Sequence, residues 1–128
     1  MNLRDAVVAA VMLLALTGCS TTSSSTAIGP TGPAWEGPVF ISQAAIPEGI
    51  EYKVIGTVQA DAQAGYDSVV TLYPLLAAEA RKLGANVVVN AKGGRRLTAF
   101  SWAAAYVIGT AVKVDDPRKL KGIPGTYH

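Results

Sequence analysis

Few residues in this chain could take part in covalent chemistry or metal binding. Among its 128 residues the sequence contains one cysteine, Cys19, and one histidine, His128. A single thiol cannot form a disulfide within the chain, so Cys19 is a packing residue, a reactive or metal-binding thiol, or a site of covalent attachment. Its position at the end of an apolar run near the start of the chain favours covalent attachment.

A metal site requires several histidine, cysteine or carboxylate ligands that converge on one point. The only histidine is the last residue, and there is no second thiol. Asp115 and Asp116 could bind a hard cation, but adjacent carboxylates before a proline are more typical of a solvated turn. We therefore expect neither a metal site nor a cofactor.

The candidate residues for hydrolytic catalysis lack partners. Ser68 and Ser101 have no histidine to activate them, and the sequence contains no GxSxG motif. Asp61 and Asp67 are the nearest candidates for the paired carboxylates of a glycosidase. A polar loop and a helix-capping role explain these two residues more simply, so we expect that the protein is not an enzyme.

Two groups of basic residues could contact an anionic surface. Lys92, Arg95 and Arg96 lie at a predicted glycine turn, and the tail carries a second group: Arg118, Lys119 and Lys121. Basic residues near anionic headgroups contribute on the order of 1 kcal/mol each, so one group could rest on lipid phosphates or on a polyanionic envelope polymer. An ordinary solvated turn and tail would explain the same residues. The formal net charge of +2 argues against nucleic acid as a partner.

Residues 1–18 have the pattern of a secretory signal peptide. Arg4 and the amino terminus precede an apolar run of eleven residues, Ala6 to Leu16. Signal peptides have apolar runs of about 7 to 15 residues, whereas a helix that spans a bilayer needs about 20. Asp5 cancels the charge of Arg4, so only the amino terminus contributes a net positive charge.

The four residues Leu16, Thr17, Gly18 and Cys19 resemble the lipobox of bacterial lipoproteins. The resemblance implies that the thiol takes a diacylglycerol, that cleavage makes Cys19 the first residue, and that its amino group receives a fatty acid such as palmitate. Several acyl chains hold a protein stably on a membrane. Ser20 after the cysteine favours the outer membrane, with the protein on its periplasmic face. A cysteine that merely ends a signal or packs in a core is the alternative.

Residues 19–38 are predicted to form a lipidated cysteine followed by a flexible tether. Ser, Thr, Gly and Pro fill 14 of the 19 positions from Ser20 to Pro38, and such a segment cannot bury enough apolar surface to offset its ordering entropy. Trp35 is the exception, and it either docks on the domain or lies in the headgroup region.

Residues 39–128 are long enough for one small domain. Alternating residues from Ile50 to Ala60 predict a strand with one buried face. The spacing of leucines and alanines predicts a helix that begins near Thr71 to Pro74 and ends at Gly84. A short buried strand, Asn86 to Asn90, extends towards Lys92 and is followed by a glycine turn in the KGGRR segment.

The run from Leu97 to Val114 is compatible with a strand or with a helix, and we favour a strand. At period two, large residues share one side and small residues the other. We expect the large side to cover a core and the small side to lie close against something else. One helix leaves the other sheet face uncovered, and a partner subunit could fill that face if it is the small side. The fold class is therefore α+β: a small, mainly antiparallel sheet with one covering helix, in the order strand-strand-helix-strand-strand.

Three segments together resemble the YbjQ-like family, whose members are labelled heavy-metal-binding proteins. They are YKVIGTVQA (Tyr52 to Ala60), AAEARKLGANVVVN (Ala77 to Asn90) and GTAVKV (Gly109 to Val114). The middle segment also resembles Rcs-type stress-sensor lipoproteins, although the disulfide cysteines of that type are absent. The YbjQ-like resemblance implies a small strand-helix-strand-strand fold, pentameric rings and no established enzyme activity.

Together these observations predict a non-enzymatic lipoprotein of the bacterial envelope. We expect it to act through contacts with an envelope protein, as an assembly, adaptor or stress-sensing module. The alternative is a homo-oligomeric protein of YbjQ-like type that binds a small ligand or a metal.

Overall fold

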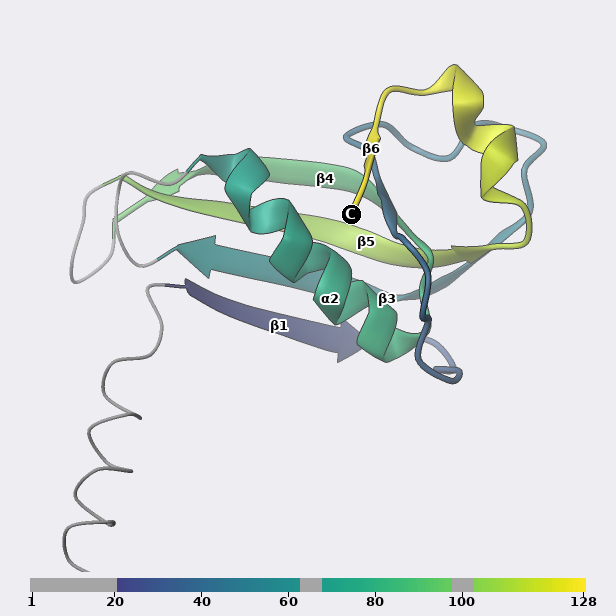
Figure 1. The fold of residues 1–128 in the computed structure, drawn as a ribbon, viewed down its shortest axis with the longest axis horizontal. Coiled ribbons are helices and arrows are strands. Elements are labelled where there is room, and N and C mark those ends of the chain that lie inside the picture. The colour runs from purple at the N-terminus through teal and green to yellow at the C-terminus, as the bar shows by residue number, and fades with distance from the viewer. Residues whose placement is uncertain (1–20, 63–67, 98–102) are drawn as a thin grey trace, which may run out of the picture.

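The computed structural model describes residues 21–62, 68–97 and 103–128. Within these residues the chain forms one six-stranded sheet, and a single α-helix lies across one face of it (Figure 1). The predicted α+β class is therefore confirmed. In chain order the elements are β1 (Thr21–Ala27), β2 (Phe40–Ile41), β3 (Tyr52–Ala62), the 3₁₀ helix η1 (Val69–Leu72), α2 (Tyr73–Leu83), β4 (Val87–Arg96), β5 (Ala104–Val114), the 3₁₀ helix η2 (Pro117–Gly122) and β6 (Thr126–Tyr127).

The strand order across the sheet is β1-β3-β5-β4-β2-β6. β3, β5 and β4 form a central antiparallel unit, and β1 adds antiparallel to β3. β2 pairs in parallel with β4 and antiparallel with β6. The predicted strands at residues 50–60, 86–90 and 97–114 correspond to β3, β4 and β5, and the predicted helix corresponds to α2. The sequence assigns no residues to the first strand of the predicted order, and the sheet also contains β1, β2 and β6.

The ends of α2 follow the predicted sequence signals. Pro74 lies in the first turn, where its missing amide proton removes no helical hydrogen bond. Gly84 adopts a left-handed conformation with φ of 86°, and its amide donates to the main-chain oxygens of Ala80 and Arg81. Arg81 and Lys82 place positive charge at the negative end of the helix dipole. The helix therefore ends where the sequence predicts.

The main hydrophobic core lies between α2 and the sheet. The helix contributes one stripe of buried side chains, Leu76, Ala77, Ala80 and Leu83. The central strands oppose it with short side chains, among them Ala60, Ala105, Val107 and Ala111. Because short side chains cover this face of the sheet, the helix can pack closely against it, as protein interiors require.

The predicted strand from Leu97 to Val114 is confirmed for β5, and Phe100 and Trp102 lie outside the described residues. The predicted roles of its two sides are confirmed only in part. The small side, which includes Ala111, packs beneath α2 and is not left for a partner subunit. The large side covers a core only at one end, where Val112 and Val114 are buried, and Ile108 in the middle of the strand is exposed.

A second, smaller cluster fills one end of the opposite sheet face. Its buried members are Phe40, Val87, Val89, Val112, Val114 and Leu120. Leu120 belongs to η2, so the carboxyl-terminal segment covers this end of the sheet. The tail that carries the second basic group is therefore partly ordered, because Leu120 packs against the sheet.

A β-bulge in β3 changes the predicted faces of that strand. The register with β5 shifts between Val54 and Gly56, so Ile55 is an extra residue. Ile55 is buried in the main core, whereas Tyr52 and Val54 are exposed on the other side of the sheet. The single buried face predicted from Ile50 to Ala60 therefore holds only beyond the bulge.

The predicted flexible tether is wrong for the residues that form β1. All seven residues of β1 pair with β3, from Thr21 with Ala62 to Ala27 with Gly56. The Ser23 hydroxyl donates a 2.7 Å hydrogen bond to Glu79 of α2. Composition misleads here because an edge strand can be held by main-chain pairing and by polar contacts with little apolar burial.

Trp35, the apolar exception in the same segment, docks on the domain. Its side chain packs against the main core, and its main-chain amide donates to the Arg81 oxygen at 3.0 Å. The indole Nε1 donates to the Pro38 oxygen at 3.0 Å. The docking alternative from the sequence is thus confirmed.

The predicted glycine turn at KGGRR is also wrong, because β4 continues through this segment to Arg96. The ladder with β5 is interrupted between Val89 and Lys92, where Asn90 has a φ of 52°. Gly93 serves close packing: a Cβ atom there would lie 2.3 Å from Cγ1 of Val69. The glycine lets η1 pack onto the strand.

Candidate functional site

The sheet face opposite α2 is left uncovered over its middle. We call this region the open face and define it as Thr57, Gln59, Asp61, Lys92, Arg96, Tyr106, Ile108 and Thr110, which the strand register places on one side. None of these residues belongs to either hydrophobic cluster. The open face is therefore a surface of the described molecule and not part of its core.

Strand pairing arranges the centre of the open face as a row across three strands. Ile108 of β5 pairs with Gln59 of β3 on one side and with Lys92 of β4 on the other. The exposed fraction of Ile108 is 36%. The row thus presents an amide, an aliphatic side chain and an ammonium group on adjacent strands.

An ion pair between Asp61 and Arg96 lies beside this row. The Arg96 guanidinium contacts the Asp61 carboxylate and lies 5.0 Å from the centroid of the Tyr106 ring. Gln59 Nε2 donates to the same carboxylate at 2.9 Å. Asp61 therefore holds β3 to β4 across β5, while Asp67, its predicted glycosidase partner, lies outside the described residues.

The predicted basic group does not form one patch. Lys92 and Arg96 pair with Ile108 and Ala104 and share the open face, whereas Arg95 pairs with Ala105 on the side of α2. Arg95 Nη1 donates to the main-chain oxygen of Ala103 at 2.7 Å. The three cations are brought to the same end of the sheet but are divided between its two faces.

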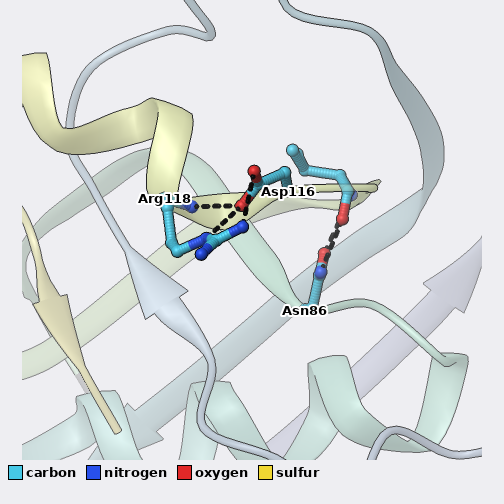
Figure 2. Close-up of polar contacts among 4 residues, drawn as sticks. Asn86, Asp116 and Arg118 are labelled. Carbon is cyan, nitrogen blue, oxygen red and sulfur yellow. Dashed lines mark hydrogen bonds and ion pairs between the residues drawn. The ribbon is translucent and has the colours of Figure 1, made fainter.

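Asp116 caps η2 and is paired with Arg118 of the second basic group (Figure 2). Its carboxylate accepts from the Arg118 amide at 3.1 Å and from Nε at 2.9 Å. The hydrogen bond from the Arg118 side chain holds the pKa of Asp116 below its usual value and raises the pKa of Arg118. This capping role confirms that Asp116 belongs to a turn.

Asn86, also drawn in Figure 2, fixes the end of β5 from within the protein. Its Nδ2 donates to the Val114 oxygen at 2.7 Å, and its Oδ1 accepts from the Val114 amide at 2.9 Å. The side chain thereby substitutes for a neighbouring strand. Asn86 belongs to the segment behind the YbjQ-like resemblance, and its role here is structural.

Neither the histidine nor the acidic residues gather into a metal centre in the described ranges. Within residues 21–62, 68–97 and 103–128, no three His, Cys, Asp or Glu side chains are grouped. His128 Nε2 lies 2.6 Å from the Thr126 hydroxyl, and its ring packs edge-on against Tyr73. The surroundings of His128 are those of a packed terminal residue.

A shallow hollow beside Trp35 is a second candidate site, which sequence reasoning missed. Lys53 and Lys113 are direct partners across β3 and β5, and Lys113 Nζ lies 3.9 Å from the centroid of the Trp35 ring. These residues and Gly84 help to line a hollow of about 460 Å³. Only the strand register brings the two lysines together, so no local sequence signal predicts the pair.

Glu79 is the most buried acidic side chain among the described residues, and its environment is structural. Besides Ser23, it is bound by Lys82 Nζ at 3.1 Å. Burial raises the pKa of Glu79, but hydrogen bonds from Ser23, Lys82 and Ser25 together outweigh burial and lower it. The charged carboxylate therefore joins α2 to the edge strand β1.

Cys19 and Ser101 lie outside the described residues, so the predicted lipidation site stays a prediction. Ser68 precedes η1, and its main-chain oxygen accepts from the hydroxyl of Thr71. The longest helix in the described part of the chain, α2, has 11 residues, and no helix there could span a bilayer.

Comparisons of the chain with protein-family models, with curated proteins and with solved structures find no match.

Proposed function

We propose that the chain is a lipid-anchored, non-enzymatic protein of the bacterial envelope that acts through protein contacts. Cys19 carries the anchor, and the domain lies on the periplasmic face of the outer membrane. The open face binds another envelope protein, so the domain works as an assembly, adaptor or stress-sensing module. The lipobox pattern supports the anchor, and the open face supports the contact.

The observation that carries the protein contact is the central row of the open face. Ile108 is an aliphatic side chain that two polar neighbours leave accessible, which is the mixed composition of protein contact surfaces. Within the described residues, Lys92 is the cation of the open face that has no acidic partner. Charge complementarity therefore favours a partner that presents a carboxylate opposite Lys92.

Photo-crosslinking in living cells tests this proposal. A photoreactive amino acid replaces Ile108 in the full-length chain, and the same residue replaces Ile28 in a matched control. Ile28 is also an exposed aliphatic residue, but it follows the last residue of β1 and is not part of the open face. We expect a defined adduct with a second envelope protein from position 108 alone, and its loss when Lys92→Glu is added.

The other outcomes have distinct meanings. An adduct of twice the chain mass from position 108 would favour the homo-oligomeric alternative over a different partner. Equal labelling from positions 28 and 108, or no adduct from either position, would contradict a contact at the open face.

A second candidate function is the binding of a small anionic ligand, and the hollow beside Trp35 favours it. Two lysines directly opposite each other repel, so an anion between them would relieve that repulsion. Native mass spectrometry of the protein purified without chelator should then show an added mass. The variant Lys113→Gln should lose it, whereas Lys119→Gln, in η2, should retain it.

A further inference from the structure

The register of the sheet shows which end of the domain is closest to Cys19. Thr21, the first residue of β1, pairs with Ala62. The next rows of the sheet place Asp61 opposite Tyr106 and Arg95 opposite Ala105. Thr21 and Arg95 therefore lie at about the same height along the strands. The end of the sheet where β1 begins and β4 ends is on the left in Figure 1.

The link from this end of the sheet to Cys19 is very short. Cys19 is two residues before Thr21, so the two Cα atoms are at most about 7 Å apart. A flexible tether over residues 19–38 would have allowed roughly 65 Å at full extension. Because β1 is part of the sheet, an anchor at Cys19 holds the end of the sheet itself at the membrane surface.

The end of β4 lies near the place where the anchor joins the sheet. Leu97 is two residues beyond Arg95, as Cys19 is two residues beyond Thr21. At about 3.3 Å per residue Leu97 extends about 7 Å past the common row, and the chain length keeps Cys19 within about 7 Å of Thr21 in the same row. About 14 Å separates β1 from β4 across three strand spacings. A membrane that contains the Cys19 acyl chains would therefore lie at the level of Leu97.

The residues at this level suit a lipid surface. Leu97 has an exposed fraction of 74%, the highest among the large apolar residues of the described chain. Arg95 and Arg96 precede it directly. An exposed apolar side chain next to cations is the combination that membrane-surface segments use, because the apolar group enters the headgroup boundary while the cations meet anionic phosphates.

We propose that the end of the sheet formed by Arg95, Arg96 and Leu97 is a membrane-contact surface for anionic lipid headgroups. The proposal rests on the lipid anchor of the proposed function and deepens it by assigning an orientation. With two attachment points, the acyl chains and the end of β4, the strands are held upright on the membrane and the domain does not move freely on a tether. The open face then points sideways, so a partner protein binds beside the domain at membrane level.

The single native cysteine makes a direct test feasible. The full-length protein is produced with its anchor and reconstituted into vesicles of phosphatidylethanolamine and phosphatidylglycerol. Leu97→Cys is labelled with an environment-sensitive fluorophore, and Ile28→Cys serves as the matched control. Ile28 has an exposed fraction of 68% and lies seven residues beyond Thr21, about 23 Å from the common row and on the side away from Leu97.

Quenching by spin-labelled lipids is the measurement. We expect the label at position 97 to be quenched severalfold more strongly than the label at position 28. Replacement of phosphatidylglycerol by phosphatidylcholine should reduce quenching at position 97, and Arg95→Gln should reproduce part of that loss. Equal quenching at positions 97 and 28 would overturn the orientation, and indifference to the lipid charge would overturn the role of the arginines.

Thiol labelling of the parent protein, which carries neither cysteine substitution, tests the lipid anchor separately from the membrane contact. If Cys19 is a thioether, the parent protein does not react with a thiol-specific label, and its mass includes the acyl chains. A parent protein that labels at Cys19 would overturn both proposals. A parent protein that is blocked at Cys19, together with equal quenching at the two positions, would overturn the membrane contact alone.

Discussion

The hydroxyl of Ser23 is expected to hold the edge strand β1 on the domain through the carboxylate of Glu79. The exposed fraction of Glu79 is 5%, and its 2.7 Å hydrogen bond from Ser23 is charge-assisted. Hydrogen bonds to charged groups contribute about 1.5 to 3 kcal/mol. Ser23→Ala should therefore lower the free energy of unfolding by about 2 kcal/mol, because the carboxylate keeps its burial and loses a donor.

Ser24→Ala is the matched control, because Ser24 is the next residue of β1 and faces the solvent. Its effect should stay within about 0.5 kcal/mol. Urea unfolding in a Cys19→Ser background, which removes the lipid, measures both changes. Hydrogen exchange should show that Ser23→Ala deprotects the amides of β1 before those of β4 and β5.

The same contact predicts a pH dependence. The pKa of Glu79 is lowered in the folded protein from an ordinary value of 4.5, so the unfolded chain binds the proton more tightly. This contribution to stability is complete above pH 4.5 and is lost as the pH falls through the folded pKa. Ser23→Ala should weaken that acid sensitivity. If Ser23→Ala and Ser24→Ala behave alike at neutral and acidic pH, the assigned role of the Glu79 contact is refuted.

Loss of β1 pairing would also change the anchor. With β1 detached, the nine residue steps from Cys19 to Ile28 would allow about 30 Å of reach instead of about 7 Å. The Ser23→Ala variant should therefore reduce quenching of the label at position 97 on vesicles, whereas Ser24→Ala should leave it unchanged.

Two further substitutions test the packing inferences, both by urea unfolding. Gly93→Ala should destabilise by about 1 to 3 kcal/mol, since the added Cβ would meet the Val69 side chain, while Gly122→Ala, with open space around it, should have little effect. Asn86→Ala should destabilise by roughly 2 to 5 kcal/mol, because it leaves both buried main-chain groups of Val114 without their partner. A loss below about 1 kcal/mol for Asn86→Ala would contradict the strand-substitute role.

The sequence identifies which residues are candidates for a site, but it does not show which of them lie on the same face of the sheet. Lys92, Arg95 and Arg96 stand out in the sequence as a basic group, yet the pleat of β4 places Arg95 on the opposite face from the other two. Asp61 stands out as a carboxylate, but its ion pair with Arg96 forms only because β3 and β4 both pair with β5. Strand register is a long-range property, so no single segment contains it.

Elements with local causes were determined by the sequence alone. The limits of α2 follow from Pro74 and Gly84, whose backbone preferences act within one turn, and the α+β class follows from the order of helical and alternating patterns. Strands and buried faces that depend on residues far away in the sequence were determined only by the tertiary structure. The polar segment Thr21–Ala27 is a strand only because β3 offers a free edge and Glu79 offers an acceptor. The docking of α2 likewise determines which side of β5 faces the main core, because a side chain is buried only where another surface covers it.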